Sequence, residues 1–185
     1  MASLINQIII SMPHMQDPYF GRAVVFICEH NKDGALGFIV NKPFETLELQ
    51  DLFSDFFPDD DDILKLVPDV YFGGPVLVER GIVLHSADYK IENTIAIGND
   101  FSLTSNKTII KEIAEKKGPK HSKLMLGHAG WAQYQLEAEI ENGDWLLEHT
   151  NIDFIFNTEE KFMWDTATKS FGIDMSEFSG FGGSA

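Results

Sequence analysis

Short runs of β-branched and aromatic residues, separated by turn residues, dominate the N-terminal part of the sequence. Three such runs occupy residues 4–11, 22–28 and 35–41, and Asn31-Lys32-Asp33-Gly34 separates the last two. These runs predict strands, because such side chains suit a pleated sheet and the residues between them favour turns. The Asp-Gly pair can supply the positive φ angles of a tight reversal, so we predict a β-hairpin at residues 31–34.

Between and after the predicted strands, some segments have apolar residues at helical spacing, and these segments occur at irregular intervals along the chain. It predicts amphipathic helices over residues 46–57, 105–118, 133–141 and 159–171, and the four aspartates at residues 59–62 predict a solvated loop. Further short apolar runs predict strands at residues 70–72, 82–84, 94–97, 124–127 and 145–147, and another short apolar run covers residues 153–156. Strands in runs with helices inserted irregularly indicate the α+β class rather than a regular β-α-β alternation.

Length and composition fit one globular domain. The chain has 185 residues, of which 44% are hydrophobic. A chain of this size buries roughly 70% of its unfolded surface on folding, so its core needs no disulfide or metal. Neither a repeat nor a linker divides it, and we expect one domain over residues 1–185 with a flexible tail at residues 176–185.

Charge and cysteine content restrict the partners and the compartment. The formal net charge of −15 repels nucleic-acid phosphates and anionic membrane surfaces. The single cysteine, Cys28, cannot form an intrachain disulfide, which agrees with a reducing compartment. The first basic residue is Arg22, and no apolar run approaches the roughly 20 residues of a membrane-spanning helix. We therefore expect a cytoplasmic protein with a protein or small-molecule partner.

Cys28 and His30 are the first candidates for catalytic chemistry. Residues two apart in a strand point to the same face, so the thiol and the imidazole could converge as nucleophile and base. The simpler alternative is a buried Cys28 and a His30 that hydrogen-bonds a turn. His85-Ser86 and Asp17 hold the residue types of a hydrolytic triad, but Ser86 lacks the Gly-x-Ser-x-Gly elbow that would expose its hydroxyl.

Three further patterns are weaker signals for ligands. His30, His85 and His128 lie near the ends of predicted strands, but their separations match no known zinc-ligand spacing, so we predict neither a metal nor a cofactor. Gly73-Gly74-Pro75 could present amides to an anion beside Arg80, although such glycine-proline pairs more often mark a tight turn. Six lysines between residues 107 and 123 could form a positive face, or a solvated helix face.

Several motifs resemble the YqgE/AlgH family of bacterial proteins. They are Met12-Pro13 with Gln16-Asp17-Pro18, the stretches at residues 22–31, 34–43 and 80–86, Gly73-Gly74-Pro75, Gly127-His128-Ala129-Gly130-Trp131, Gln135-Leu136-Glu137 and Gly172-Ile173-Asp174. The resemblance spans nearly the whole chain and implies an α+β fold in which a mixed, bifurcated sheet curls into a pseudo-barrel with helices packed outside. The family is largely uncharacterised and implies no catalytic residue, while the AlgH name implies regulation of alginate genes.

We therefore expect a binding or regulatory protein rather than an enzyme. The family motifs cluster at predicted turns, where binding residues are often displayed. The candidate binding surface comprises Asp17, His30, Asn41, Arg80, His85 and Trp131. Two alternatives remain open. One is a transcriptional regulator that acts indirectly, or directly through DNA contacts of the lysine-rich stretch at residues 107–123. The other is an enzyme that uses His30, His85 or Cys28 inside the pseudo-barrel.

Overall fold

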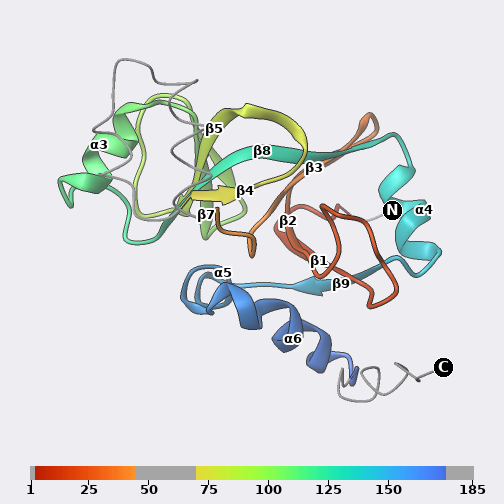
Figure 1. Ribbon diagram of the computed structural model, residues 1–185. Coiled ribbons are helices and arrows are strands. Elements are labelled where there is room, and N and C mark those ends of the chain that lie inside the picture. Colours follow the sequence, from red (N-terminus) through yellow and green to blue (C-terminus); the bar gives the residue numbers. More distant parts are fainter. Residues whose placement is uncertain (1–2, 45–69, 174–185) are drawn as a thin grey trace.

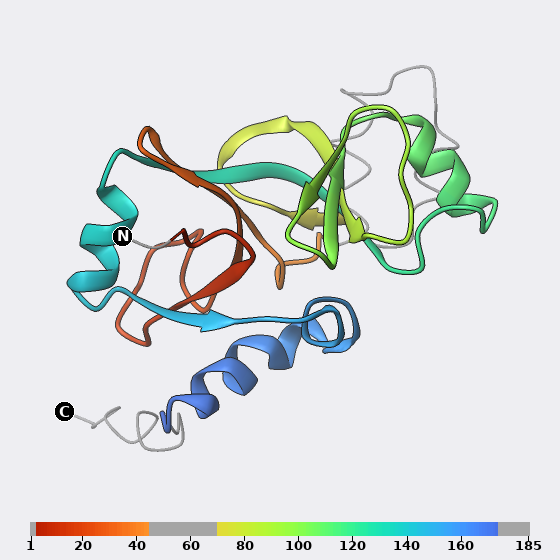
Figure 2. The ribbon, with the colours of Figure 1, turned by 180° about the vertical axis from the view of Figure 1, so that it is seen from behind.

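Nine strands form a single curled sheet in the computed structural model, which describes residues 3–44 and 70–173 (Figures 1 and 2). Their order across the sheet is β6-β7-β5-β8-β3-β2-β1-β9, and β4 also pairs with β8. The strands are β1 (Gln7–Ser11), β2 (Val24–Asn31), β3 (Gly34–Ile39), β4 (Val70–Phe72), β5 (Val76–Ser86), β6 (Thr94–Ile97), β7 (Phe101–Thr104), β8 (Ser122–Ala132) and β9 (Trp145–His149).

The sheet divides at β8. Residues 124–126 pair in parallel with β4, while the other edge of β8 carries the antiparallel strand β5. Residues 129–132 pair antiparallel with β3, which leads on to β2, β1 and β9. One long strand therefore belongs to two branches, and the expected mixed, bifurcated and curled sheet of an α+β fold is confirmed.

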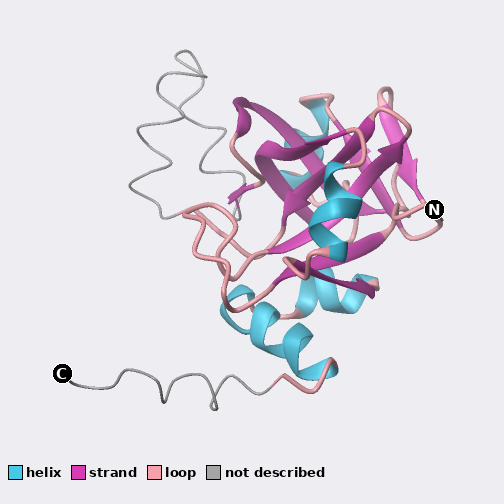
Figure 3. Ribbon diagram, turned by 90° about the vertical axis from the view of Figure 1, so that its right-hand side faces the viewer, coloured by secondary structure: helices cyan, strands magenta, loops and turns pink. Residues whose placement is uncertain are grey.

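Helices pack on the outside of this sheet (Figures 1 and 3). The described helices are α3 (Thr108–Ala114), α4 (Gln135–Glu141), α5 (Ile152–Asn157) and α6 (Glu160–Ser170). The first two lie at opposite ends of the sheet, and α5 and α6 run along one side of it. No helix in the described ranges is long and apolar enough to span a bilayer.

The strand β2 shows why the N-terminal runs are continuously apolar. Val24 and Phe26 face one core cluster, which the buried side of α6 closes, whereas Val25 and Ile27 face a second cluster that includes Leu136 of α4. A strand covered on both faces needs apolar residues at every position rather than at alternate ones. Burial of each such large side chain stabilises the fold by about 1.5–3 kcal/mol.

An ion pair between a buried lysine and a partly exposed glutamate holds the start of α6 against β8. The ammonium of Lys123, whose side chain is 3% exposed, donates to Glu160 Oε1 at 2.8 Å, and the Tyr71 hydroxyl donates to the same oxygen at 2.6 Å. Burial raises the pKa of Glu160, but the hydrogen bonds from Lys123 and Tyr71 outweigh it and lower that pKa overall. The carboxylate therefore stays ionised at neutral pH.

Most predicted elements are confirmed, with differences at their ends. The hairpin forms as expected, with Asn31 paired to Gly34. β5 and β8 are longer than predicted, and the sequence does not predict β7, because its polar residues break the apolar run. The run at residues 153–156 belongs to helix α5, whose first turn is capped by the Asn151 side chain. The expected helix at 46–57, the loop at 59–62 and the tail at 176–185 lie outside the described residues.

Candidate functional site

An apolar pocket of about 590 Å³ lies between β2 and β3 on one side and β5, β6 and β7 on the other. Its apolar lining includes Ile5, Cys28, Leu36, Phe38, Leu77, Ile82, Ile95, Ile97 and Leu103, and its polar lining includes Glu29, Arg80, Ser105 and His128. Small-molecule sites are typically hollows of this size, mostly apolar, with a few polar groups that orient the ligand. This pocket is therefore the candidate site.

An irregular segment of β5, with several extra residues, forms one wall of the pocket. Four residues of β5, 77–80, stand opposite the single residue Gly127 of β8. The additional residues interrupt the ladder and bring Leu77 and Arg80 to the pocket. Leu77 adopts a φ of +50°, a left-handed conformation that costs a residue with a side chain about 1–2 kcal/mol. The pocket wall is thus a strained segment held by the strands around it.

A second bulge, at Cys28 in β2, forms the facing wall. The register with β3 shifts between Ile27 and Glu29, which leaves Cys28 as the extra residue. Because a bulge interrupts the alternation of side chains, Cys28 and its neighbour Glu29 both line the pocket. The Cys28 thiol is buried, and this burial raises its pKa far above the ordinary value.

The same bulge separates His30 from Cys28, so the predicted convergence of thiol and imidazole is wrong. The imidazole of His30 lies beside the N-terminal segment and α4. Its Nδ1 accepts from the Leu4 amide at 3.1 Å, and its Nε2 donates to Glu137 Oε1 at 2.9 Å. This pattern assigns a neutral ring with the proton on Nε2. No hydrogen bond within the described residues joins any two of Cys28, His30 and His85.

Besides Cys28, three residues with ionisable side chains line the pocket: Glu29, Arg80 and His128. Arg80 is the permanent cation among the described lining residues, and Glu29 is the carboxylate. Burial, and secondly the charge of Arg80, lowers the pKa of His128, so its imidazole is neutral near pH 7. The pocket thus combines one fixed positive charge, one neutral imidazole and one negative charge.

His85 lies in the core of the sheet, where its side chain is fully buried. Its Nδ1 donates to the Ser86 carbonyl at 2.8 Å, and its Nε2 accepts from the Thr104 hydroxyl at 2.8 Å. Thr104 in turn accepts from the Thr94 hydroxyl at 2.7 Å. Burial lowers the pKa of His85, which agrees with this neutral, fully hydrogen-bonded imidazole. His85 therefore has the surroundings of a structural histidine.

The family model described as AlgH-like (DUF179) matches residues 8–176. The chain belongs to the AlgH-like family. It is 36% identical to a UPF0301 protein of Shewanella loihica over the whole of both chains. It is also 40% identical to a UPF0301 protein of a Jannaschia species, over 92% of this chain and 90% of that one.

Solved structures show the same fold. The solution structure of AlgH from Pseudomonas aeruginosa has a TM-score of 0.76 at 31% identity, covering 100% of this chain and 99% of that one. A crystal structure of a Corynebacterium diphtheriae protein has a TM-score of 0.70 at 18% identity, over 92% and 88% of the two chains, and shows the fold alone.

In this AlgH-like chain, Asp17 and Asn41 hold loops in place. Asp17 Oδ1 accepts from two backbone amides of the turn that follows it, at 2.8 and 2.9 Å. The Asn41 side chain accepts from the Val24 amide and donates to the Arg22 carbonyl, both at 2.9 Å. Both side chains therefore fix nearby backbone through local hydrogen bonds.

Trp131 is 7% exposed and packs beside Trp145. The indole nitrogens of both residues donate to the same oxygen, Glu139 Oε2, at 2.8 and 2.9 Å. This arrangement ties β8 and β9 to α4. It leaves the indole nitrogen of Trp131 with a partner inside the fold.

Of the six residues of the candidate binding surface, Arg80 is the one that lines the apolar pocket. The fold does not bring the other five to it: His85 and Trp131 are buried, and Asp17, His30 and Asn41 make the local contacts given above. Sequence reasoning assigned no ligand role to Glu29 or Leu77, and treated His128 only as a metal candidate. Glu29 and His128 lie in the family motifs at residues 22–31 and 127–131, but no motif predicts that these two residues and Leu77 line one pocket, because two strand bulges bring them together.

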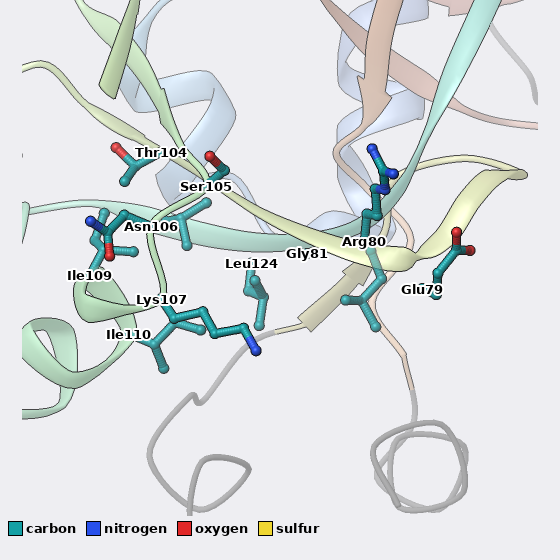
Figure 4. A pocket seen from close by; sticks show the side chains of 12 residues that line it. Glu79, Arg80, Gly81, Thr104, Ser105, Asn106, Lys107, Ile109, Ile110 and Leu124 are labelled. Atoms are coloured by element: carbon teal, nitrogen blue, oxygen red, sulfur yellow. The ribbon is translucent and has the colours of Figure 1, made fainter. Parts of the chain in front are cut away.

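The lysine-rich stretch is partly neutralised within the fold. Lys111 and Lys117 lie 3.9 and 2.8 Å from the carboxylate of Glu115, and Lys123 is buried in the ion pair with Glu160. A second hollow of about 300 Å³ lies between α3 and β5, with Lys107 on its wall (Figure 4). Figure 4 shows the Arg80 guanidinium pointing away from the Lys107 ammonium, although both residues line this hollow.

The three histidines considered as metal ligands occupy different surroundings. His30 pairs with Glu137, His85 lies in the sheet core, and His128 lines the apolar pocket. Within residues 3–44 and 70–173, no group of three or more histidine, cysteine, aspartate or glutamate side chains is arranged to hold a metal ion.

Proposed function

We propose that this AlgH-like protein is a cytoplasmic binding or regulatory protein and that the apolar pocket is its ligand site. The observation that carries the proposal is the pocket itself, an open hollow of about 590 Å³ with aliphatic walls and few polar groups. Filling such a hollow removes apolar surface from water, which favours binding by about 25 cal/mol per Å².

The structure favours this function over the two alternatives. The enzyme alternative is less favoured, because of its candidate residues His30, His85 and Cys28 only Cys28 lines the described part of the pocket. The raised pKa of Cys28 keeps its thiol protonated and weakly nucleophilic. For direct DNA binding, the pairing of Lys111 and Lys117 with Glu115 and the net charge of −15 both reduce attraction to phosphates.

The test measures binding of N-phenyl-1-naphthylamine, an uncharged fluorophore that brightens in apolar surroundings, to the full chain. Leu36 is half-buried on β3, and it lines the pocket on the same face of the strand as Phe38, so Leu36→Trp should fill the hollow and weaken probe binding at least about tenfold. Ala132 is exposed at the far end of β8, away from the pocket, and Ala132→Trp is the control. Circular dichroism checks that both variants fold.

Native mass spectrometry of gently purified protein provides an independent measurement. A retained small molecule that Leu36→Trp displaces supports the proposal. If Leu36→Trp and Ala132→Trp both leave probe binding unchanged, the pocket is not the ligand site.

A further inference from the structure

We propose, on the basis of the proposed ligand site, that the pocket binds an aliphatic monocarboxylate with its carboxylate at Arg80 and His128 and its hydrocarbon chain inside the hollow. The inference combines three features of the described residues: the chemistry of the inner wall, the exposed side chains at the mouth and the charges there.

The inner wall suits a flexible hydrocarbon chain. Leu36, Ile82, Ile97 and Leu103 supply branched aliphatic surface, and Phe38 is the one aromatic residue of the described lining. The pocket wall therefore offers hydrophobic and dispersion contact along its surface but few hydrogen-bonding groups. A strongly polar or sugar-like ligand would lose its hydration without replacement partners there.

Apolar side chains are also exposed at the mouth. Ile5, Leu77 and Ile95 are 37%, 41% and 62% exposed, and all three line the pocket. They come from three separate parts of the chain, and Leu77 reaches the mouth only through the strained bulge of β5. Exposed apolar residues gathered around one hollow indicate a surface that a ligand covers.

The charges at the pocket select a monoanion. The Arg80 guanidinium can donate two parallel hydrogen bonds to a carboxylate, and the neutral His128 imidazole can add a third. Glu29 also lines the pocket, and its Oε1 accepts from the Asn31 side chain at 2.6 Å, so the field there is only weakly positive. A doubly charged phosphate would meet more repulsion from Glu29 with the same single permanent cation.

The test uses decanoate, decan-1-ol and decyl phosphate as competitors of N-phenyl-1-naphthylamine, below their micellar concentrations. We expect decanoate to displace the fluorophore at lower concentration than the other two. Arg80→Gln should weaken decanoate at least about tenfold, the usual effect of losing a charge-assisted hydrogen bond, and leave decan-1-ol unchanged. Lys107→Gln is the matched control, because Lys107 lines the other hollow.

The outcomes separate this inference from the proposed function. If decanoate and decan-1-ol compete equally and Arg80→Gln changes neither, the carboxylate inference is overturned and the pocket remains the site. The inference is overturned in the same way if decyl phosphate binds more tightly than decanoate, or if decanoate does not compete while Leu36→Trp still weakens binding of the fluorophore. If Leu36→Trp leaves fluorophore binding unchanged, the pocket is not the site and the proposed function fails as well. His128→Gln gives a second variant, expected to weaken decanoate less than Arg80→Gln does.

Discussion

The carbonyl oxygen of Gly74 lies so close to Gly127 that a Cβ atom on Gly127 would be 2.3 Å from it. A Cβ on Gly74 would in turn be 2.3 Å from the carbonyl oxygen of His128. Both glycines have positive φ angles, +150° at Gly74 and +72° at Gly127. This backbone crossing explains the two glycine motifs, because only residues without side chains let the segment before β5 pass so close to β8.

We expect Gly127→Ala to lower the free energy of unfolding by about 3 kcal/mol, from the left-handed φ and the steric overlap together. Gly130→Ala is the control in the same strand, because a Cβ on Gly130 meets nothing within 4 Å. Urea unfolding followed by circular dichroism measures both variants. Equal stability of the two variants would contradict the steric role of the crossing.

Thr104→Val should lower the free energy of unfolding by about 1–3 kcal/mol, because it removes the hydroxyl that donates to the buried His85 imidazole. The valine keeps the shape of the side chain, so the loss reports the hydrogen bond. Thr166→Val, at an exposed position on α6, is the matched control and should change stability by less than about 0.5 kcal/mol. Urea unfolding at pH 7.5 measures both, and a Thr104→Val protein as stable as the control would count against the network.

His85 should also make stability depend on pH. Its folded-state pKa is lowered by burial from the ordinary 6.5, so the unfolded chain binds the proton more tightly. The contribution of the neutral histidine is therefore fully present above about pH 6.5 and is lost as pH falls through the folded-state pKa. The stability difference between the wild-type protein and His85→Gln should shrink from pH 7.5 to pH 5. A difference that stays constant would show that His85 does not titrate with folding.

Glu139→Leu should destabilise the protein by about 3 kcal/mol, because two buried indole N–H groups lose their acceptor. Glu139→Gln keeps an amide oxygen as acceptor and should cost about half as much. The exposed Glu141→Gln, on the same helix, is the control, with an expected change of less than about 0.5 kcal/mol. Urea unfolding followed by tryptophan fluorescence measures all three. A Glu139→Leu protein as stable as Glu141→Gln would mean that the shared carboxylate contributes no stability.

The Cys28 thiol should resist modification in the folded protein. It is 5% exposed, and burial raises its pKa, so little thiolate is present even at pH 8. Ellman's reagent should therefore label it only slowly in buffer and stoichiometrically in 6 M guanidinium chloride. Rapid labelling of the native protein would contradict the assignment of a buried, protonated thiol, and Cys28 would again be a candidate nucleophile.

Elements with strong local signals could be predicted from the sequence. The prediction of the hairpin at residues 31–34 depends on its turn residues, and that of a helix over residues 159–171 depends on the spacing of Trp164, Ala167 and Phe171; the helix forms over residues 160–170, with Trp164 and Ala167 buried and Phe171 exposed just beyond its end. Both signals lie within a few neighbouring residues, so they need no information about the rest of the fold. The overall curled sheet was an implication of the family resemblance rather than of local patterns.

The candidate site could not be predicted in the same way, and the prediction for Cys28 and His30 shows why. Strict alternation along a strand places both on one face, but a single extra residue in β2 reverses the alternation. That bulge is defined only by the pairing of β2 with β3. His85 lies near a predicted strand end in the sequence, yet β7, a strand without an apolar run, buries it.

The amino-acid sequence by itself determined the α+β class, the hairpin, most of the strands and, through its motifs, the family. The tertiary structure alone decided which side chains meet at the apolar pocket. Arg80 and His128 are 48 positions apart and come together because a bulge in β5 stands opposite Gly127. Secondary structure follows from interactions between near neighbours, whereas a pocket follows from the register between strands, which is fixed only when the whole sheet has closed.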